Sequence, residues 1–156
     1  TTNLSTLEDQ AVYLPHLMLT AFSSGVSSCF WYEFQNPEVG VLDKEDNFGL
    51  VHKSLTPKPA YQAYKTLIEA RPAESRSTFF EIDGDLIRAG WKRPDGTNAV
   101  AVWRAGTAQE VELKFTGQVT KAFDYLGSEI PVPAGKAALS PKVLYFIGPE
   151  SVEFVK

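Results

Sequence analysis

Hydrophobic residues recur at helical spacing near the start of the chain, which predicts a helix that begins near Ser5. In the tetrapeptide STLE, Ser5 can accept from the third amide of the helix while Glu8 reaches back to Ser5, as in a capping box. Pro15 interrupts the pattern, and because an interior proline costs roughly 3 kcal/mol, we expect a kink there. Gly25 ends the helix, whose apolar positions are Leu7, Ala11, Leu14, Leu17, Met18, Ala21 and Phe22.

A strand and a second helix are predicted next. The run VSSCFWYEF, residues 26–34, is apolar on both faces near its middle, which is typical of strands covered on both sides. Residues 35–55 then form a long loop rich in Asn, Pro, Gly and acidic residues. Thr56 is a suitable N-cap and Pro57 a suitable first helical residue. The predicted buried stripe of this helix, which ends near Ala70 and Pro72, is Ala60, Tyr61, Tyr64, Leu67 and Ile68.

Short alternating runs replace the helical pattern from residue 78 to residue 156. They are separated by turn signals such as PDGTN, FTGQ, LGSE and VPAGKAALSPK, and this regular spacing predicts an antiparallel β-sandwich. The polar segment RPAESRS, residues 71–77, marks the boundary, so we expect one unit over residues 1–72 and another over 73–156. The runs are DLIRAGWKR, NAVAVWRA, QEVELKF, VTKAFDYLG, KVLYFIG and SVEFVK.

The predicted strand of the first unit poses a physical problem. A strand buried on both faces between two amphipathic helices cannot form a sheet alone, because its backbone donors and acceptors need neighbouring strands. Residues 1–72 are therefore expected to be the terminal helix–strand–helix of a larger α/β protein whose earlier strands are not in this sequence.

Composition narrows the classes of partner. With 44% hydrophobic residues in 156, the chain can bury a core, and a formal charge of −4 without any basic run argues against nucleic acid or an anionic membrane as main partner. No apolar run reaches the roughly 18 residues that a membrane helix needs. The single cysteine, Cys29, cannot form an intrachain disulfide, and its apolar surroundings favour a buried thiol. The beginning, TTNLSTLEDQ, lacks the features of a signal peptide, and we expect the chain to be cut from a longer one.

Residues 30–67 carry a family resemblance. The run FWYEFQN, a loop, and then DNFGLVHKSLTPKPAYQAYKTL together resemble the end of the catalytic barrel of clan A glycoside hydrolases. The preceding LEDQAVYLPHLMLTAFSSGV resembles the seventh helix of that (β/α)8 barrel, including a proline in its middle. The resemblance implies that residues 26–34 are the eighth strand and that TPKPAY opens the eighth helix. A small sandwich after the barrel is also common in these families.

The resemblance implies a retaining glycosidase that acts on an oligo- or polysaccharide and needs neither cofactor nor metal. Such enzymes use two carboxylates about 5–5.5 Å apart, which in clan A lie at the ends of strands four and seven. This chain begins after the seventh strand of that scheme, so no catalytic residue is assigned. Hydrolysis of O-glycosidic bonds is therefore expected only together with an upstream barrel part of the same protein. The parent protein of such a family can be secreted or periplasmic, and the sequence does not locate it.

Four residues are candidates for substrate binding: Trp31, Glu33, Gln35 and Asn36. The resemblance implies that Trp31 forms the floor of the subsite for the sugar that is cleaved, and a flat apolar ring suits the C–H face of a pyranose. The alternative is a core aromatic. Glu33 and Gln35 alternate with Trp31, so all three can point to one side of a strand. They either bind sugar hydroxyls or anchor the loop, and Glu33 matches no catalytic position of the family.

Other chemistry-bearing residues favour structural roles. The loop residues Asn36, Asp43, Glu45, Asp46 and Asn47 contact substrate or form a solvated acidic turn, with the turn favoured, and their spacing fits no EF-hand. His16 and His52 have no acid or cysteine at metal-ligand spacing and are interpreted as structural. Trp91 and Trp103 fall in opposite phases of adjacent predicted strands, so one could be an exposed sugar platform. Packing of both against the helices is the favoured interpretation.

Two further functions compete with the terminal part of a glycoside hydrolase. In the first, the sandwich is a non-catalytic carbohydrate-binding or scaffolding module that binds saccharide through Trp91 or Trp103. In the second, the chain is a complete small enzyme that uses Glu33 with Asp43 or Asp46. That hypothesis is the weakest, because its strand would have no sheet partners.

Overall fold

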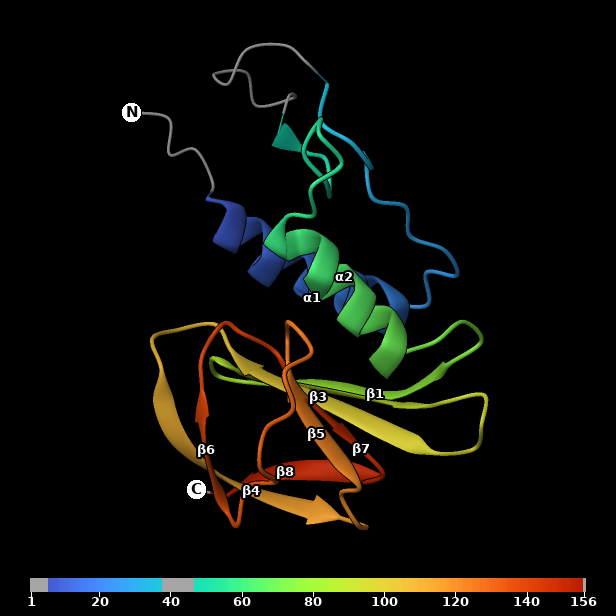
Figure 1. The fold of residues 1–156 in the computed structure, drawn as a ribbon. Helices are drawn as coiled ribbons and strands as arrows, with labels where there is room; N and C mark the ends of the chain where they lie inside the picture. The colour runs from blue at the N-terminus through green and yellow to red at the C-terminus, as the bar shows by residue number, and fades with distance from the viewer. Residues whose placement is uncertain (1–5, 38–46, 156) are drawn as a thin grey trace.

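The computed structural model describes residues 6–37 and 47–155. Two helices lie over one face of a sandwich of two antiparallel β-sheets, so the fold is mixed α/β and mostly β (Figure 1). Over the described residues, neither helix is long and apolar enough to cross a membrane. The elements are α1 (Leu7–Ser23), α2 (Pro59–Ala70), β1 (Arg76–Asp83), β2 (Leu86–Lys92), β3 (Asn98–Arg104), β4 (Gln109–Thr116), β5 (Lys121–Asp124), β6 (Lys136–Leu139), β7 (Leu144–Ile147) and β8 (Ser151–Val155).

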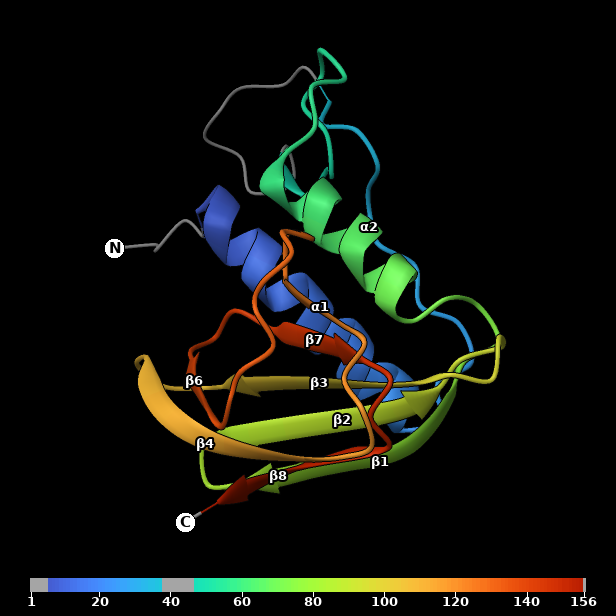
Figure 2. The ribbon, with the colours of Figure 1, turned by 60° about the horizontal axis from the view of Figure 1, so that its bottom comes forward.

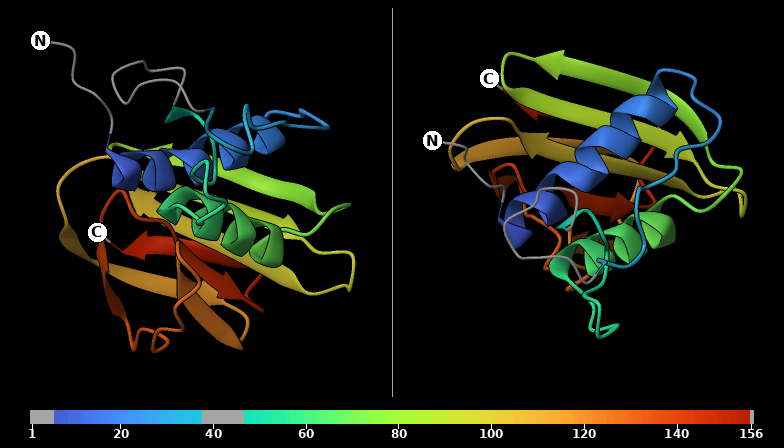
Figure 3. Two further views of the ribbon diagram at one scale, coloured as in Figure 1. Left: turned by 45° about the horizontal axis from the view of Figure 1, so that its top comes forward. Right: turned by 90° about the horizontal axis from the view of Figure 1, so that it is seen from above.

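The larger sheet has the strand order β1-β2-β3-β7-β5, and the smaller sheet has the order β6-β4-β8 (Figure 2). All named strand pairs are antiparallel. Between β2 and β3, Trp91 lies opposite Ala99 and Ile87 lies opposite Trp103. Because side chains alternate along a strand, these four residues share one face of the larger sheet. That face is the one that α1 and α2 cover, as Figure 3 shows from above.

Two hydrophobic cores result from this layering. One joins the helices to the larger sheet and includes Leu14, Met18, Leu67, Trp91 and Trp103. The other fills the space between the two sheets and includes the buried valines of β3. Strand β3 is buried on both faces because its alternate residues enter different cores.

Helix α1 is capped one residue later than the sequence pattern suggests. Thr6 is the N-cap, since its side chain accepts from the Asp9 amide and Asp9 accepts in turn from the Thr6 backbone. The expected cap Ser5 lies outside the described residues. Glu8 does not close the box, because its carboxylate instead meets Lys142 at 2.7 Å and the Tyr125 hydroxyl at 3.1 Å. Pro15 lies inside the helix and is buried.

Helix α2 also begins later than predicted. The N-cap is Lys58 and the first helical residue is Pro59, not Pro57, because Pro57 still forms an antiparallel bridge with Val51. The helix ends at Ala70, close to the predicted end. Its stripe is shifted as well, since Ile68 is 49% exposed. The buried residues are Ala60, Ala63, Thr66, Leu67 and Ala70.

Among the described residues, six of the eight strands coincide with the alternating runs of the sequence, whereas β1 and β6 match none of these runs. β1 begins at Arg76, inside the segment expected to be a linker, and β6 lies inside the run VPAGKAALSPK that was interpreted as a turn. Both are edge strands. An edge strand has one pairing partner and carries more exposed residues, so its hydrophobic pattern is weak.

Candidate functional site

The stretch predicted to be a buried strand, residues 26–34, is not a strand, and we call its residues 27–34 the aromatic segment. The backbone of residues 27–32 makes no hydrogen bond with any other described residue, so no sheet forms there. Its side chains nevertheless alternate. Cys29 and Trp31 pack against the helical core, whereas Phe30, Tyr32 and Phe34 are 91%, 75% and 58% exposed. The expectation that both faces are covered is therefore wrong for this chain: one face is covered and the other is open.

Trp31 is fixed by the stretch that follows the loop. Its indole Nε1 donates to the carbonyl oxygen of Phe48 at 2.8 Å, and its ring packs partly against the helical core. The ring is half-buried. A hydrogen bond from the polar edge holds the indole in one orientation, which suits a rigid apolar platform.

Gln35 and Asn36 hold the returning chain through their own hydrogen bonds. The Gln35 amide donates to the Lys53 carbonyl at 2.7 Å, and Gln35 forms a parallel bridge with Val51. The Asn36 backbone donates to the Val51 carbonyl at 3.1 Å, and its side-chain oxygen accepts from Lys58 at 2.7 Å. These hydrogen bonds are compatible with the loop-anchoring role that the sequence left open for Gln35, and its sugar-binding role stays a prediction.

Lys58 is the central cation of this region, and it is only 2% exposed. Its ammonium donates to the Asn36 side chain and, at 3.0 Å, to the Asn47 carbonyl. These two residues flank the segment 37–46, so one side chain ties both ends of that segment together. Burial lowers the pKa of Lys58, and the nearby charge of Glu33 opposes that shift. A buried ammonium of this kind needs hydrogen-bond acceptors, because a buried charge that lacks them is strongly destabilising.

Trp31, Gln35 and Asn36 are joined to residues 47–58 by the hydrogen bonds described above, and we call this set of contacts the anchor. Gly49 and Gln10 also belong to it. A Cβ atom at Gly49 would lie 2.4 Å from Asn36 Oδ1 and 2.5 Å from Asn36 N, so only glycine lets the two backbones approach this closely. The Gln10 amide reaches from α1 and donates to the Phe48 carbonyl at 3.0 Å. The tetrapeptide NFGL thus meets the aromatic segment on one side and α1 on the other.

Glu33 is half-buried and makes no side-chain hydrogen bond within the described residues. The peptide bond between Tyr32 and Glu33 is cis. The backbone oxygen of Glu33 accepts from the Leu50 amide at 3.1 Å, which joins it to the same anchor. Trp31, Glu33, Gln35 and Asn36 are therefore all brought against residues 48–58, with the carboxylate of Glu33 in the field of Lys58.

The acidic loop residues Asp43, Glu45 and Asp46 lie outside the described residues, and so does the pairing of Glu33 with either aspartate. Asn47 is described, and its carbonyl accepts from Lys58. Across residues 6–37 and 47–155, no group of three or more His, Cys, Asp or Glu side chains could hold a metal ion.

The two sandwich tryptophans are buried in the core beneath the helices, as the favoured interpretation predicted. Trp91 is 2% exposed and its Nε1 donates to the Ala70 carbonyl at 2.9 Å, while Trp103 is 3% exposed. The expected opposite phases are wrong, because the register places both on the same face of the larger sheet. His16 stacks on Trp103 at 5.1 Å and its Nε2 contacts the Pro141 carbonyl oxygen at 2.7 Å, so it has a structural role.

Sequence reasoning missed three residues of the anchor: Gln10, Gly49 and Lys58. Lys58 stands between two prolines directly before a helix, where a solvent-exposed lysine is the ordinary expectation. The only usable signal was the glycine of NFGL, because a glycine outside a tight turn can mark close backbone approach. A single sequence does not tell which backbone approaches.

Comparisons with known proteins give similarity at the level of solved structures. No protein-family model matches the chain, and no curated protein matches it. The structure is similar to that of a family 39 glycoside hydrolase from the gut symbiont Bacteroides cellulosilyticus WH2, with a TM-score of 0.79 and 26% sequence identity. The match covers 95% of this chain but 31% of that one, so the chain spans about a third of the glycoside hydrolase that it resembles. This similarity supports relatedness to glycoside hydrolases.

Proposed function

We propose that this chain is the C-terminal part of a retaining glycoside hydrolase of clan A. Residues 1–72 would supply the last helix, strand and helix of its (β/α)8 barrel, and residues 73–156 an accessory sandwich. The observation that carries the proposal is the structural match, which runs over both parts of the chain and is 26% identical to a glycoside hydrolase. The residue pattern from FWYEFQN to TPKPAY supports it independently.

In this function the chain binds sugar and does not itself break the bond. Trp31 would be the platform beneath the sugar ring, since its indole is fixed by the Phe48 carbonyl. Glu33, Gln35 and Asn36 would form the polar edge of the same subsite, with the Asn36 side chain held by a hydrogen bond from Lys58. The acid and the nucleophile, about 5–5.5 Å apart in retaining enzymes, would come from upstream strands. The substrate would be an oligo- or polysaccharide, and the reaction needs no cofactor.

The competing function, a carbohydrate-binding sandwich, has less support. A sugar platform must be exposed to reach its ligand, yet Trp91 and Trp103 are buried beneath the helices. Every aromatic side chain of residues 76–155 is buried or half-buried. Among the described residues, the exposed aromatic side chains lie instead on the barrel side of the proposed boundary: Tyr13, Phe30, Tyr32, Phe34 and Phe48.

The test compares this chain with an extended protein, meaning the chain together with the polypeptide encoded upstream of it. Both are assayed against a panel of aryl glycosides that covers the common pyranoses in both anomers. We expect hydrolysis by the extended protein and none by the 156-residue chain. Robust hydrolysis by the chain alone, or no hydrolysis by the extended protein on any substrate, would overturn the proposal.

The role of Trp31 is tested in the extended protein. Trp31→Ala removes the stacking surface, and we expect an increase in KM of about tenfold, whereas Trp31→Phe keeps a flat ring and most of the affinity. If Trp31→Ala leaves both KM and kcat unchanged, Trp31 is not the platform, even when the enzyme is a glycosidase.

A further inference from the structure

Residues 51–57 form a small hairpin beside the candidate site. Val51 and Pro57 form an antiparallel bridge, and the His52 amide donates to the Thr56 carbonyl at 2.9 Å. The Leu55 amide donates to the His52 carbonyl at 2.9 Å, so residues 53–55 are the loop of the hairpin. The last residue of this loop, Leu55, has a φ of 63°. Hairpins with three-residue loops have a left-handed residue at this place, and that residue is usually glycine.

The fold of the described residues does not require a leucine at position 55. In the left-handed region the Cβ atom of an L-residue lies too close to the following carbonyl oxygen, a clash that glycine avoids. Burial of the side chain would offset this cost, but Leu55 is 61% exposed and belongs to neither hydrophobic core. Unfavourable backbone of this kind clusters at functional sites, so the leucine points to a ligand outside the chain.

The hairpin is fixed to the candidate site through Gln35, whose Nε2 donates to the Lys53 carbonyl at 2.7 Å. The Ser54 and Thr56 hydroxyls lie 2.9 Å apart, within hydrogen-bonding distance, and Leu55 is the apolar side chain of the loop. From the start of α2 the hairpin projects away from the sandwich (Figure 2). In the proposed function it follows the eighth strand, at the barrel end where substrates bind.

We propose that Leu55 is a specificity-determining contact for the group that is joined to the sugar on Trp31. An exposed leucine offers apolar surface, and the ligand that it fits offers apolar surface in turn. Glycosides carry two groups of this chemistry: the C–H face of a second pyranose and the aromatic ring of an aryl aglycone. This role rests on the proposed function, in which Trp31 holds the sugar that is cleaved, and it makes Leu55 the residue that discriminates among the attached groups.

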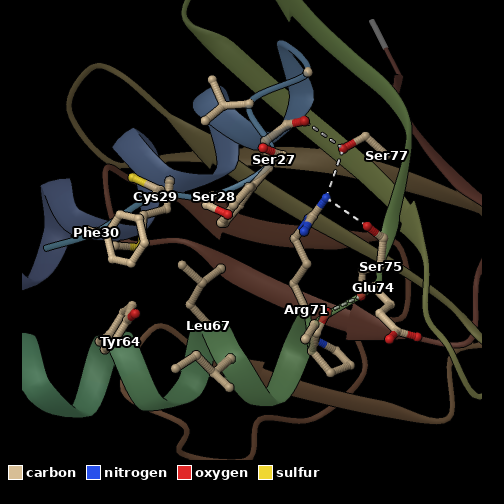
Figure 4. Close-up of a pocket in the computed structure, with 17 residues that line it drawn as sticks. Ser27, Ser28, Cys29, Phe30, Tyr64, Leu67, Arg71, Glu74, Ser75 and Ser77 are labelled. Carbon is tan, nitrogen blue, oxygen red and sulfur yellow. Dashed lines mark hydrogen bonds between the residues drawn. The ribbon is translucent and has the colours of Figure 1, made fainter.

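The cost of the leucine is measured first, in the isolated chain. Leu55→Gly is compared with Glu74→Gly, because Glu74 is also exposed and has a φ of 66°. Glu74 follows the opposite end of α2, next to Ser75 (Figure 4), and this helix of 12 residues is about 18 Å long. We expect either substitution to raise Tm by about 1–3 °C, because it relieves the same backbone clash. A lower Tm for Leu55→Gly would mean that the leucine supports the fold, and the proposal would lose its basis.

Substrate specificity is then measured in the extended protein. Three ligands share the sugar that it cleaves: a p-nitrophenyl glycoside, a disaccharide, and a methyl glycoside that serves as competing inhibitor. We expect Leu55→Gly to raise KM about fivefold for at least one of the first two, since it removes an apolar contact. The Ki of the methyl glycoside should stay the same, because its methyl group does not extend beyond the platform. Leu55→Met keeps an apolar side chain and should keep KM, and Glu74→Gly should leave all three values unchanged.

The outcomes distinguish the ligand of Leu55 and the ways in which this role can fail. A rise in KM for the p-nitrophenyl glycoside alone identifies an aryl aglycone, and a rise for the disaccharide identifies a second sugar. Unchanged KM for both, or an equal rise in the Ki of the methyl glycoside, would defeat the role of Leu55 in a protein that is still a glycosidase. Equal losses in Leu55→Met and Leu55→Gly would contradict an apolar contact. If the extended protein hydrolyses no substrate, the proposed function fails, and this role fails with it.

Discussion

Strand β3 and the aromatic segment have similar hydrophobic patterns, but they differ in strand pairing and in burial. Both are short apolar runs around a tryptophan, NAVAVWR in β3 and VSSCFWYEF in residues 26–34. β3 pairs with β2 and β7, and its two faces enter the two cores. The aromatic segment has the helical core on one face and an open face on the other, and the backbone of its residues 27–32 bonds to no other described residue. An apolar pattern thus indicates that a segment is to be buried, but it does not indicate which part of the chain buries it.

The largest expected effect tests whether the larger sheet and the aromatic segment differ as strongly in their contribution to the free energy of unfolding as in burial. Trp91 of β2, the strand that pairs with β3, represents the sheet. Trp91→Ala removes a side chain that is 2% exposed and leaves the Ala70 carbonyl without its donor, so we expect a loss of about 3–5 kcal/mol in the free energy of unfolding. Tyr32→Ala removes a side chain that is 75% exposed and should change it by about 0.5 kcal/mol or less. Urea unfolding of the isolated chain, followed by circular dichroism, measures both. A comparable loss for Tyr32→Ala would mean that the aromatic segment is covered in solution.

The second prediction concerns the anchor that holds the end of the aromatic segment. Lys58→Met removes the buried ammonium and leaves two oxygens, Asn36 Oδ1 and the Asn47 carbonyl, without that donor. We expect the free energy of unfolding to fall by about 1–3 kcal/mol, and the effect should be strongest on local opening around residues 33–37 and 47–58. Hydrogen exchange should show faster opening at Leu50 and Val51, whose amides bond to the aromatic segment.

Lys65→Met is the matched control for Lys58, because Lys65 lies on α2, the helix that begins directly after Lys58, and is exposed. It should leave exchange at Leu50 and Val51 unchanged. If both variants behave alike, the buried ammonium does not hold the two ends of the segment 37–46 together.

The sequence was informative wherever a pattern depends on local physics. Alternating runs identified β2, β3, β4, β5, β7 and β8, because each of these strands faces a core with every second residue. The edge strands β1 and β6 are not predicted from the sequence, because a half-exposed strand shows little alternation of hydrophobic and polar residues. The phase of Trp91 and Trp103 was wrong because register depends on the turn between β2 and β3, not on either strand alone.

The candidate site shows a different limit. The sequence predicts the candidates Trp31, Glu33, Gln35 and Asn36, whose role in binding stays a prediction. It gives no signal for Lys58, which donates to Asn36, or for Gln10, which donates to the Phe48 carbonyl. A buried lysine is stable only when its acceptors are in place, and those acceptors are carbonyl and amide groups far along the chain. Such partners depend on tertiary structure, which has no periodic signature in the sequence.

The third prediction sharpens the position of the first cap. The Thr6 hydroxyl oxygen accepts from the Asp9 amide at 3.0 Å, and the Thr6 amide donates to the Asp9 carboxylate at 2.8 Å. Thr6→Ala should therefore cost about 1 kcal/mol of the free energy of unfolding. The sequence pattern alone assigns this loss to Ser5, so Ser5→Ala is the comparison. A larger loss for Ser5→Ala than for Thr6→Ala would return the cap to the earlier residue.

The smallest expected effect is a pH dependence that belongs to the helical core. Burial against Trp103 lowers the pKa of His16 below its ordinary value of 6.5, and the Pro141 carbonyl only partly opposes this. The unfolded chain then binds a proton more readily than the folded one, so stability is complete above about pH 6.5 and falls as the pH drops below it. Tm should be lower at about pH 5.5 than at about pH 7.5.

Substitution separates this histidine from other titrating groups. The carboxylates with lowered pKa values, Glu8, Asp9 and Asp95, start from 4.5 or 3.8, so their contribution is lost only at more acidic pH. His16→Gln should therefore reduce the difference in Tm between the two pH values, whereas His52→Gln keeps His16 and should preserve it. If His16→Gln leaves the difference unchanged, the stacked imidazole is not the source, and the helix–sheet core carries no proton-sensitive contact at this position.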